Sequence, residues 1–144
     1  MVVVIFTIAV SIGSGIYLPD PDLTSTGLFH PLILTAGKGI NFSFSLMPTG
    51  RDEYRLDLFL FDLGLTGSKG VLSGRLGLGG GRIIRAFNSH QEKGFGFFSS
   101  LRIGPRFPIS GFTIFPSFDF YLLSDRKGWT WITGIGLELG YEIP

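Results

Sequence analysis

Apolar side chains recur at every second position along most of the chain, and a period of two is the period of a β-strand. The clearest run is Trp129–Ile143, where one face is almost wholly apolar and aromatic while the other carries mostly Thr, Gly and Glu. Alternating runs of this kind cover residues 2–18, 32–46, 54–65, 71–87, 95–107, 109–123 and 129–143. None of them is the stretch of ~20 mostly apolar residues that a membrane-spanning helix needs. The pattern therefore predicts an all-β protein.

Short polar segments separate these runs. They combine Gly with Ser, Asn, Asp or Lys, which favour turns, and lie at residues 47–53, 66–70, 88–94 and 124–128. Strands joined by short turns predict an antiparallel up-and-down sheet, as a barrel or a sandwich. Bacterial membrane barrels have even strand numbers, from eight upward. We therefore expect about eight strands, one of them poorly marked. The alternative is a turn at Gly79–Gly81 that splits residues 71–87 into two pieces, which look too short to span a membrane.

The alternation fits a barrel in water or in lipid, because the apolar face points inward in the first and outward in the second. Runs of 12 to 15 residues exceed the usual globular strand of ~5–6 and suit a tilted span of ~9–11. The second face consists of Gly, Ser and Thr rather than Lys and Glu, which suits a narrow interior. Trp129 and Trp131 begin the last run and Tyr141 lies near its end, where interfacial aromatic belts are expected. These features predict an antiparallel transmembrane β-barrel.

A soluble lipocalin-like barrel that binds an apolar small ligand is the alternative. In such a barrel Phe42, Phe44, Phe118 and Phe120 point inward and surround a cavity. The two interpretations differ only in which face meets the solvent, so the direction of these phenylalanines decides between them.

The C-terminal residues carry a further signal. The ten residues before the final Pro144 read Gly-Ile-Gly-Leu-Glu-Leu-Gly-Tyr-Glu-Ile, with Gly136, Leu139 and Tyr141 spaced through alternating hydrophobic residues. This ending resembles the terminal strand of small bacterial outer-membrane β-barrel proteins, the eight-stranded OmpA/OmpX-like class. The resemblance implies a bacterial outer-membrane location and recognition of the C-terminal strand by the barrel-insertion machinery. The sequence departs from that pattern by ending in Ile143-Pro144 rather than in an aromatic residue.

Charged residues enter the barrel interior if the small-residue face points inward. Four are basic and four acidic, namely Arg55, Arg75, Arg102, Arg106, Asp57, Asp119, Glu138 and Glu142. Charges in a poorly hydrated interior are costly unless they are paired. We expect Arg75, Arg102, Asp119 and Glu138 to form a lumenal ion-pair network that fixes the strand register and seals the bore. A neutral lumen filled by side chains, as about eight strands enclose, argues against a conducting pore.

The composition and the motifs of the sequence argue against most other classes of function. The chain has 12 basic and 11 acidic residues, too little positive charge for a nucleic-acid partner. Cysteine is absent, and the two histidines, His30 and His90, have no clustered carboxylates, so neither a metal site nor a catalytic centre is expected. The glycine-rich segment Gly74–Gly81 is not followed by the Lys-Ser/Thr of a phosphate loop. We expect no enzyme activity and no cofactor.

The N-terminal residues allow two interpretations. Residues 1–12 are either the remnant of a signal peptide, without its positively charged leader, or the first strand of the barrel. In both cases we expect residues 1–144 to form a single barrel domain. Its role is structural, with the lipid bilayer as its partner, or it binds an unknown ligand through loops near residues 19–31, 50–53, 90–93 and 125–127.

Overall fold

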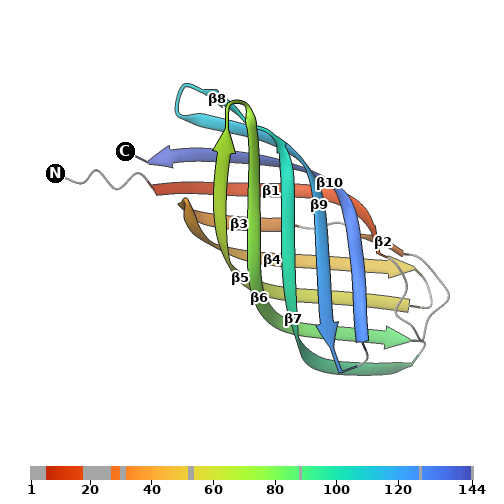
Figure 1. Cartoon of the computed structure of the whole chain (residues 1–144). Helices are drawn as coiled ribbons and strands as arrows, with labels where there is room; N and C mark the ends of the chain where they lie inside the picture. Colours follow the sequence, from red (N-terminus) through yellow and green to blue (C-terminus); the bar gives the residue numbers. More distant parts are fainter. Residues whose placement is uncertain are drawn as a thin grey trace.

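The computed structural model describes residues 6–17, 27–29, 32–51, 54–87, 89–126 and 128–143, and nearly all of them lie in antiparallel strands (Figure 1). The strands are β1 Phe6–Tyr17, β2 Gly27–Phe29, β3 Leu32–Lys38, β4 Ile40–Arg51, β5 Tyr54–Lys69, β6 Leu72–Phe87, β7 His90–Pro105, β8 Phe107–Ile109, β9 Phe112–Asp125 and β10 Gly128–Ile143. Among these residues no helix is long and apolar enough to span a membrane.

These ten segments form eight barrel strands. β2 and β3 lie between the same neighbours, β1 and β4, in one continuous register, so they are two parts of one strand. β8 likewise continues β7 along β9. β10 pairs with β9 on one side and with β1 on the other, which closes the sheet. The predicted all-β fold and the predicted number of strands are confirmed.

The poorly marked strand lies inside residues 32–46, which the alternation predicted as a single run. This run is two strands, β3 and β4, joined at Gly39. Lys38 pairs with Ile40 across the turn, so only Gly39 separates the two strands. A one-residue turn therefore leaves the period of two intact and hides the hairpin. Gly39 has a φ of 74°, a conformation that favours glycine. The alternative prediction of a turn at Gly79–Gly81 is wrong, because β6 continues through these residues.

The register fixes the tilt of the strands. Ile8 pairs with Tyr141 of β10 on one side. In the other direction its register line passes through Ala36, Phe42, Leu63, Leu78, Ser99 and Leu122 and returns to β10 at Trp131. Trp131 and Tyr141 are ten residues apart, so one circuit of the eight strands shifts the register by ten. That shear corresponds to a tilt of about 40°.

The two ends of the barrel carry different sets of connections, and the longest connection, after Tyr17, leaves from the second of them. We call the turn end the one where β1 begins, β10 ends, and tight turns at Gly39, Gly70 and Gly111 join the strands. We call the loop end the opposite one, from which the connections after Tyr17, Arg51, Phe87 and Asp125 depart. Residues 90–93, which we expected in a loop, are the exposed beginning of β7 at this end. Most of the other predicted loop residues lie outside the described part of the chain.

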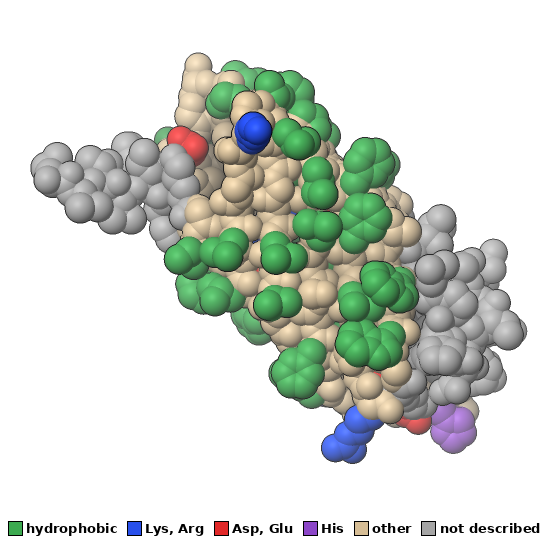
Figure 2. All heavy atoms as spheres, viewed as in Figure 1, with side chains coloured by type: hydrophobic (Ala, Val, Ile, Leu, Met, Phe, Trp, Pro, Cys, Tyr) green, Lys and Arg blue, Asp and Glu red, His purple; other side chains and the backbone are tan. Residues whose placement is uncertain are grey.

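The outer wall of the barrel is apolar. Hydrophobic side chains cover the visible wall, and the charged side chains in view sit toward its ends (Figure 2). Phe42 and Phe118 are 68% and 64% exposed, Phe120 also faces outward, and Phe44 packs against Phe61 with 4.8 Å between ring centroids. The soluble alternative placed these four phenylalanines around a central cavity. Their position outside the barrel contradicts it.

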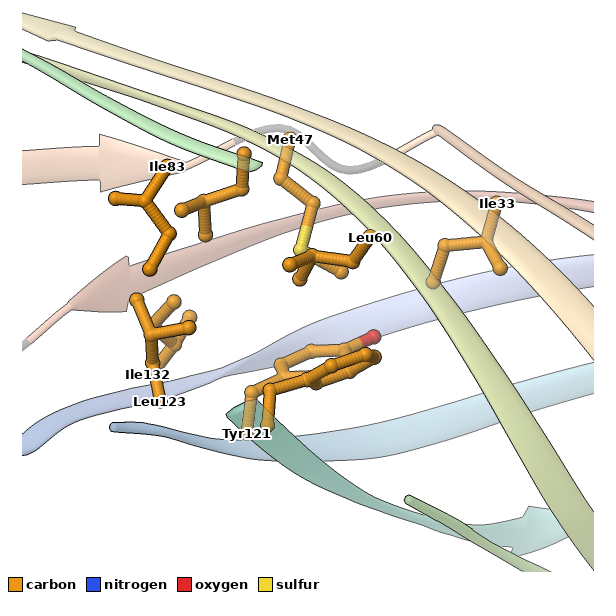
Figure 3. Close-up of a cluster of buried hydrophobic side chains, with 9 residues drawn as sticks. Ile33, Met47, Leu60, Ile83, Tyr121, Leu123 and Ile132 are labelled. Carbon is orange, nitrogen blue, oxygen red and sulfur yellow. The ribbon is translucent and has the colours of Figure 1, made fainter. Parts of the chain in front are cut away.

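Nine buried side chains form an apolar cluster inside the barrel toward the loop end (Figure 3). The members of this apolar cluster are Ile33, Met47, Leu58, Leu60, Ile83, Phe98, Tyr121, Leu123 and Ile132. The sequence pattern did not predict it, because it expected mainly small and polar residues to face inward. Leu58 and Leu60 of β5 are flanked by outward-facing Phe59 and Phe61, so this strand is apolar on both faces. The expected interior of small and polar side chains is therefore found in only part of the lumen.

Candidate functional site

Arg102 lies at the centre of a buried ion network inside the barrel. Its side chain is 1% exposed, and its Nε donates to Oδ1 of Asp119 at 3.0 Å. Its Nη1 donates to Oε2 of Glu138 at 2.9 Å and to Oγ of Ser11 at 3.0 Å. One guanidinium group thus connects four strands, β7, β9, β10 and β1, through charge-assisted hydrogen bonds.

Strand register explains why these groups meet. Arg102 and Asp119 are direct cross-strand partners of β7 and β9, and Ser11 and Glu138 are direct partners of β1 and β10. Closely opposed residues share a face of the sheet, here the inner one. Ser117 supports the arrangement, since its Oγ donates to Asp119 at 2.6 Å and accepts from Nη2 of Arg102 at 3.3 Å.

Arg106 extends the network toward the turn end. Its Nη2 donates to Oε1 of Glu138 at 3.4 Å, so Glu138 receives one arginine on each carboxylate oxygen. The guanidinium carbon of Arg106 also lies 4.9 Å from the ring centre of Phe115, and that of Arg102 lies 5.7 Å from it. Both guanidinium groups thus lie within the range of a cation–π contact with the Phe115 ring.

Arg75 belongs to a second cluster rather than to the one around Arg102. It forms a close ion pair with Asp62 of β5, and its Nε donates to Oδ1 of Asn41 at 2.7 Å. Arg75 and Arg102 are direct cross-strand partners, and like charges that face each other repel. Arg75 and Arg102 therefore pair with different acids. The structure brings together only three of the four residues expected in one network.

One of the predicted inward charges needs correction. Asp57 occupies an outward-facing position of β5, while Asp62 is the buried acid of that strand. The error arose because β5 is apolar on both faces, so its polar positions could not be assigned to a side. The side chain of Arg55 lies outside the described residues. At the loop end Nη1 of Arg85 pairs with Oδ2 of Asp125 at 2.9 Å, a contact that the sequence pattern did not predict.

Two cavities open at opposite ends of the barrel. The one at the turn end has about 300 Å³ and is lined largely by hydroxyl and charged side chains, including Thr35, Thr66, Arg106 and Glu142. The one at the loop end has about 410 Å³ and lies beside the Arg85–Asp125 pair. The Arg102 network and the apolar cluster occupy the barrel interior between the two ends.

The three predicted interface aromatics lie on the outer surface of β10. Trp129 and Trp131 are exposed near the loop end, and Tyr141 is exposed near the turn end beside Phe112, at 5.0 Å between ring centroids. Ten residues at ~3.3 Å and a tilt of about 40° separate Trp131 from Tyr141 by about 25 Å along the barrel axis. An apolar band of about that height is typical of membrane barrels.

The described part of the chain contains no group of three or more His, Cys, Asp or Glu side chains that could hold a metal ion. His90 is exposed at the start of β7, and His30 lies outside the described residues. The buried acids Asp62, Asp119 and Glu138 each contact an arginine.

Comparison with solved structures shows the same fold in two other proteins. The crystal structure of Neisserial surface protein A superposes with a TM-score of 0.64, covering 96% of this chain and 97% of that chain at 5% identity. The crystal structure of Ail, the attachment invasion locus protein of Yersinia pestis, gives 0.58 over 99% and 100% at 14% identity. Ail in complex with the heparin analogue sucrose octasulfate gives 0.53 over 98% and 100% at 13% identity.

These likenesses concern the fold. No protein-family model matches the sequence, and no curated protein sequence matches it. The chain has the fold of small eight-stranded outer-membrane barrels, as the resemblance of its C-terminal strand implied.

Proposed function

We propose that this protein is a non-catalytic β-barrel of a bacterial outer membrane, whose lumen is closed by its own side chains and whose loop end binds a partner. The observation that carries this proposal is the inverted distribution of polarity. Large apolar side chains cover the outside between Trp131 and Tyr141, while Arg75, Arg102 and their acids are buried within. Water around the barrel would leave that apolar surface exposed, whereas hydrocarbon would cover it.

Refolding and flotation test the membrane assignment. The full chain, unfolded in urea and diluted into detergent or phospholipid vesicles, is expected to float with the vesicles and to migrate faster on a gel before boiling than after it. The faster band reports a closed barrel that resists the gel detergent. A monomer that stays soluble without detergent would contradict the proposal.

The closed lumen is supported by what fills the space between the two cavities. The Arg102 network joins four strands across the bore, and the nine-residue apolar cluster lies next to it along the axis. Small eight-stranded barrels hold little more than their own side chains. Refolded protein in a planar bilayer is therefore expected to show no steady ion conductance, and a steady open level at neutral pH would contradict the closed lumen.

The absence of catalysis is proposed because the buried acids of the described residues are already hydrogen-bonded to other side chains. Asp62, Asp119 and Glu138 accept hydrogen bonds from arginine or serine, which leaves them poorly placed as general bases. Vesicles of labelled phospholipid are expected to remain intact with the refolded barrel. Hydrolysis by wild type that is lost in His90→Ala would contradict this part of the proposal.

Partner binding is assigned to the loop end, because four connections leave the barrel there and a cavity of about 410 Å³ opens between β6, β7 and β9. Ail, a protein of the same fold, has been crystallised with a sulfated sugar. Trypsin added to intact cells that express the chain is expected to cut at the loop end, after Arg126, and to spare Lys69 at the turn end. The reverse pattern would place the loops on the other side of the membrane.

We also propose that the barrel-insertion machinery recognises the C-terminal strand, and the position of β10 in the barrel supports this. Residues 132–143 of β10 pair with β1 and residues 128–141 pair with β9, so β10 completes the barrel. Residues 6–12 pair with β10, and residues 8–12 also pair with β3, which favours the first-strand interpretation of the N-terminal segment over the signal remnant. Mass spectrometry of protein extracted from membranes tests this, because a cut near Ala9 would remove part of β1.

A further inference from the structure

An apolar groove crosses the outer wall of the barrel near the loop end. It has about 790 Å³ and lies over β6 between the aromatic side chains of β5 and β7. The residues that line it include Phe61, Leu78, Gly80, Arg82, Phe95 and Phe97. Gly80 faces outward at its floor, and its cross-strand partners are Phe61 on one side and Phe97 on the other. The groove is therefore a shallow channel between aromatic walls.

Arg82 stands at one end of this groove. It is exposed on the outer face of β6, with Phe59 and Phe95 as its cross-strand partners. Among the described residues no ion pair or hydrogen bond engages its guanidinium group. Asp57, two residues from Phe59 along β5, has a contact of its own, and exposed Lys93 adds a second cation farther toward the loop end. The groove thus combines an apolar channel with a positive end.

The depth of Arg82 in the membrane follows from the register. Leu78 lies on the register line of Trp131, three strands away, and Arg82 lies four residues beyond Leu78 toward the loop end. Crossing three strands from Trp131 along the register line moves toward the turn end, and following β6 for four residues moves back toward the loop end. With ~4.8 Å between strands, ~3.3 Å per residue and a tilt of about 40°, these two displacements along the barrel axis cancel to within about 1 Å. Arg82 therefore lies at the level of Trp131, where lipid headgroups meet the hydrocarbon, and Gly80 and Leu78 lie below it.

We infer that this groove binds one anionic glycerophospholipid, with an acyl chain between the Phe61 and Phe97 side chains and the phosphate on Arg82. The inference rests on the proposed membrane location. Charge complementarity selects the headgroup, since a guanidinium group donates paired hydrogen bonds to phosphate oxygens. The depth of Arg82 selects a lipid rather than a free anion, because the same molecule must reach the headgroup level and the apolar channel below.

Native mass spectrometry of the refolded barrel tests the site with three probes. Dioleoylphosphatidylglycerol has both the chain and the phosphate, dioleoylglycerol has only the chains, and glycerol 3-phosphate has only the phosphate. Wild type is expected to retain one phosphatidylglycerol molecule and neither of the other two. Arg82→Gln is expected to lower this retention about fivefold, the usual effect of one basic residue at a lipid surface.

Matched controls separate the site from general effects. Lys69→Gln removes the same charge at the turn end and is expected to leave retention unchanged. Phe97→Ala removes one wall of the groove and should reduce retention, whereas Phe118→Ala removes a similarly exposed phenylalanine, 64% against 70%, from β9 and should not.

The outcomes distinguish this inference from the proposed function. A barrel that shows the faster gel band but retains phosphatidylglycerol equally in Arg82→Gln and Lys69→Gln would overturn the lipid site and leave the membrane barrel standing. Retention of glycerol 3-phosphate at the same level as phosphatidylglycerol would also overturn the lipid site. A homodimer of the protein that Phe97→Ala dissociates would overturn it as well. A chain that forms no folded band in detergent would refute the proposed function instead.

Discussion

Removal of the Arg102 guanidinium group is the sharpest test of the lumenal network. Arg102→Met keeps much of the side-chain volume but leaves Asp119 and part of Glu138 without their cation. Breaking a buried ion pair by removing one partner costs about 3–5 kcal/mol. Glu138 keeps Arg106, and Asp119 keeps the hydroxyl of Ser117 at 2.6 Å, so we expect a loss of free energy of unfolding near the lower value, about 3 kcal/mol.

Equilibrium unfolding by urea in phospholipid vesicles measures this loss. Trp129 and Trp131 are the only tryptophans of the chain, and both are exposed on β10, so their fluorescence reports when that strand leaves the lipid. The double variant Arg102→Met/Asp119→Asn removes the uncompensated charge and is expected to recover at least half of the loss, because a neutral pair can replace an ionic one. Arg126→Met, at an exposed position, is the control and should change stability by less than about 0.5 kcal/mol.

Two results would refute this reasoning. If Arg102→Met unfolds within about 1 kcal/mol of wild type, the pairs contribute little and the lumen is more hydrated than its burial indicates. If the double variant is as unstable as the single one, the loss comes from packing of the Arg102 side chain and not from its charge.

Three further predictions concern the outer wall, the small inward residues and the hidden turn. Phe118→Arg places a charge near the middle of the apolar band and is expected to cost about 2–4 kcal/mol in vesicle unfolding; a neutral effect would contradict lipid contact there. Gly136→Leu should prevent formation of the fast gel band, because a Cβ at this position would lie 2.4 Å from Oδ2 of Asp119, whereas Gly67→Leu, where no atom lies within 4 Å, should fold normally. Gly39→Ala should lower the free energy of unfolding by about 1 kcal/mol, since the φ of 74° at this position is unfavourable for alanine. Stability equal to that of wild type would show that the turn tolerates another conformation.

Alternation predicted the faces of most strands correctly because a period of two depends only on the local backbone. Phe118 and Phe120 point outward and Ser117 and Asp119 inward, as a single run of sequence indicates. The prediction was wrong at β5, where Leu58 and Leu60 inside and Phe59 and Phe61 outside leave no contrast to detect. Asp57 was placed inward for that reason, and the buried Asp62 was missed.

The sequence by itself determined the strand period, the apolar outer face and the small inner one, because each depends on which side a side chain leaves the backbone. Only the closed sheet decided which residues meet across the bore, since partners come from the register shift of ten around eight strands. That shift sets Arg102 against Asp119 and Glu138 and assigns Arg75 to Asp62. It also brings Arg82 to the level of Trp131, although 49 positions separate them in the chain.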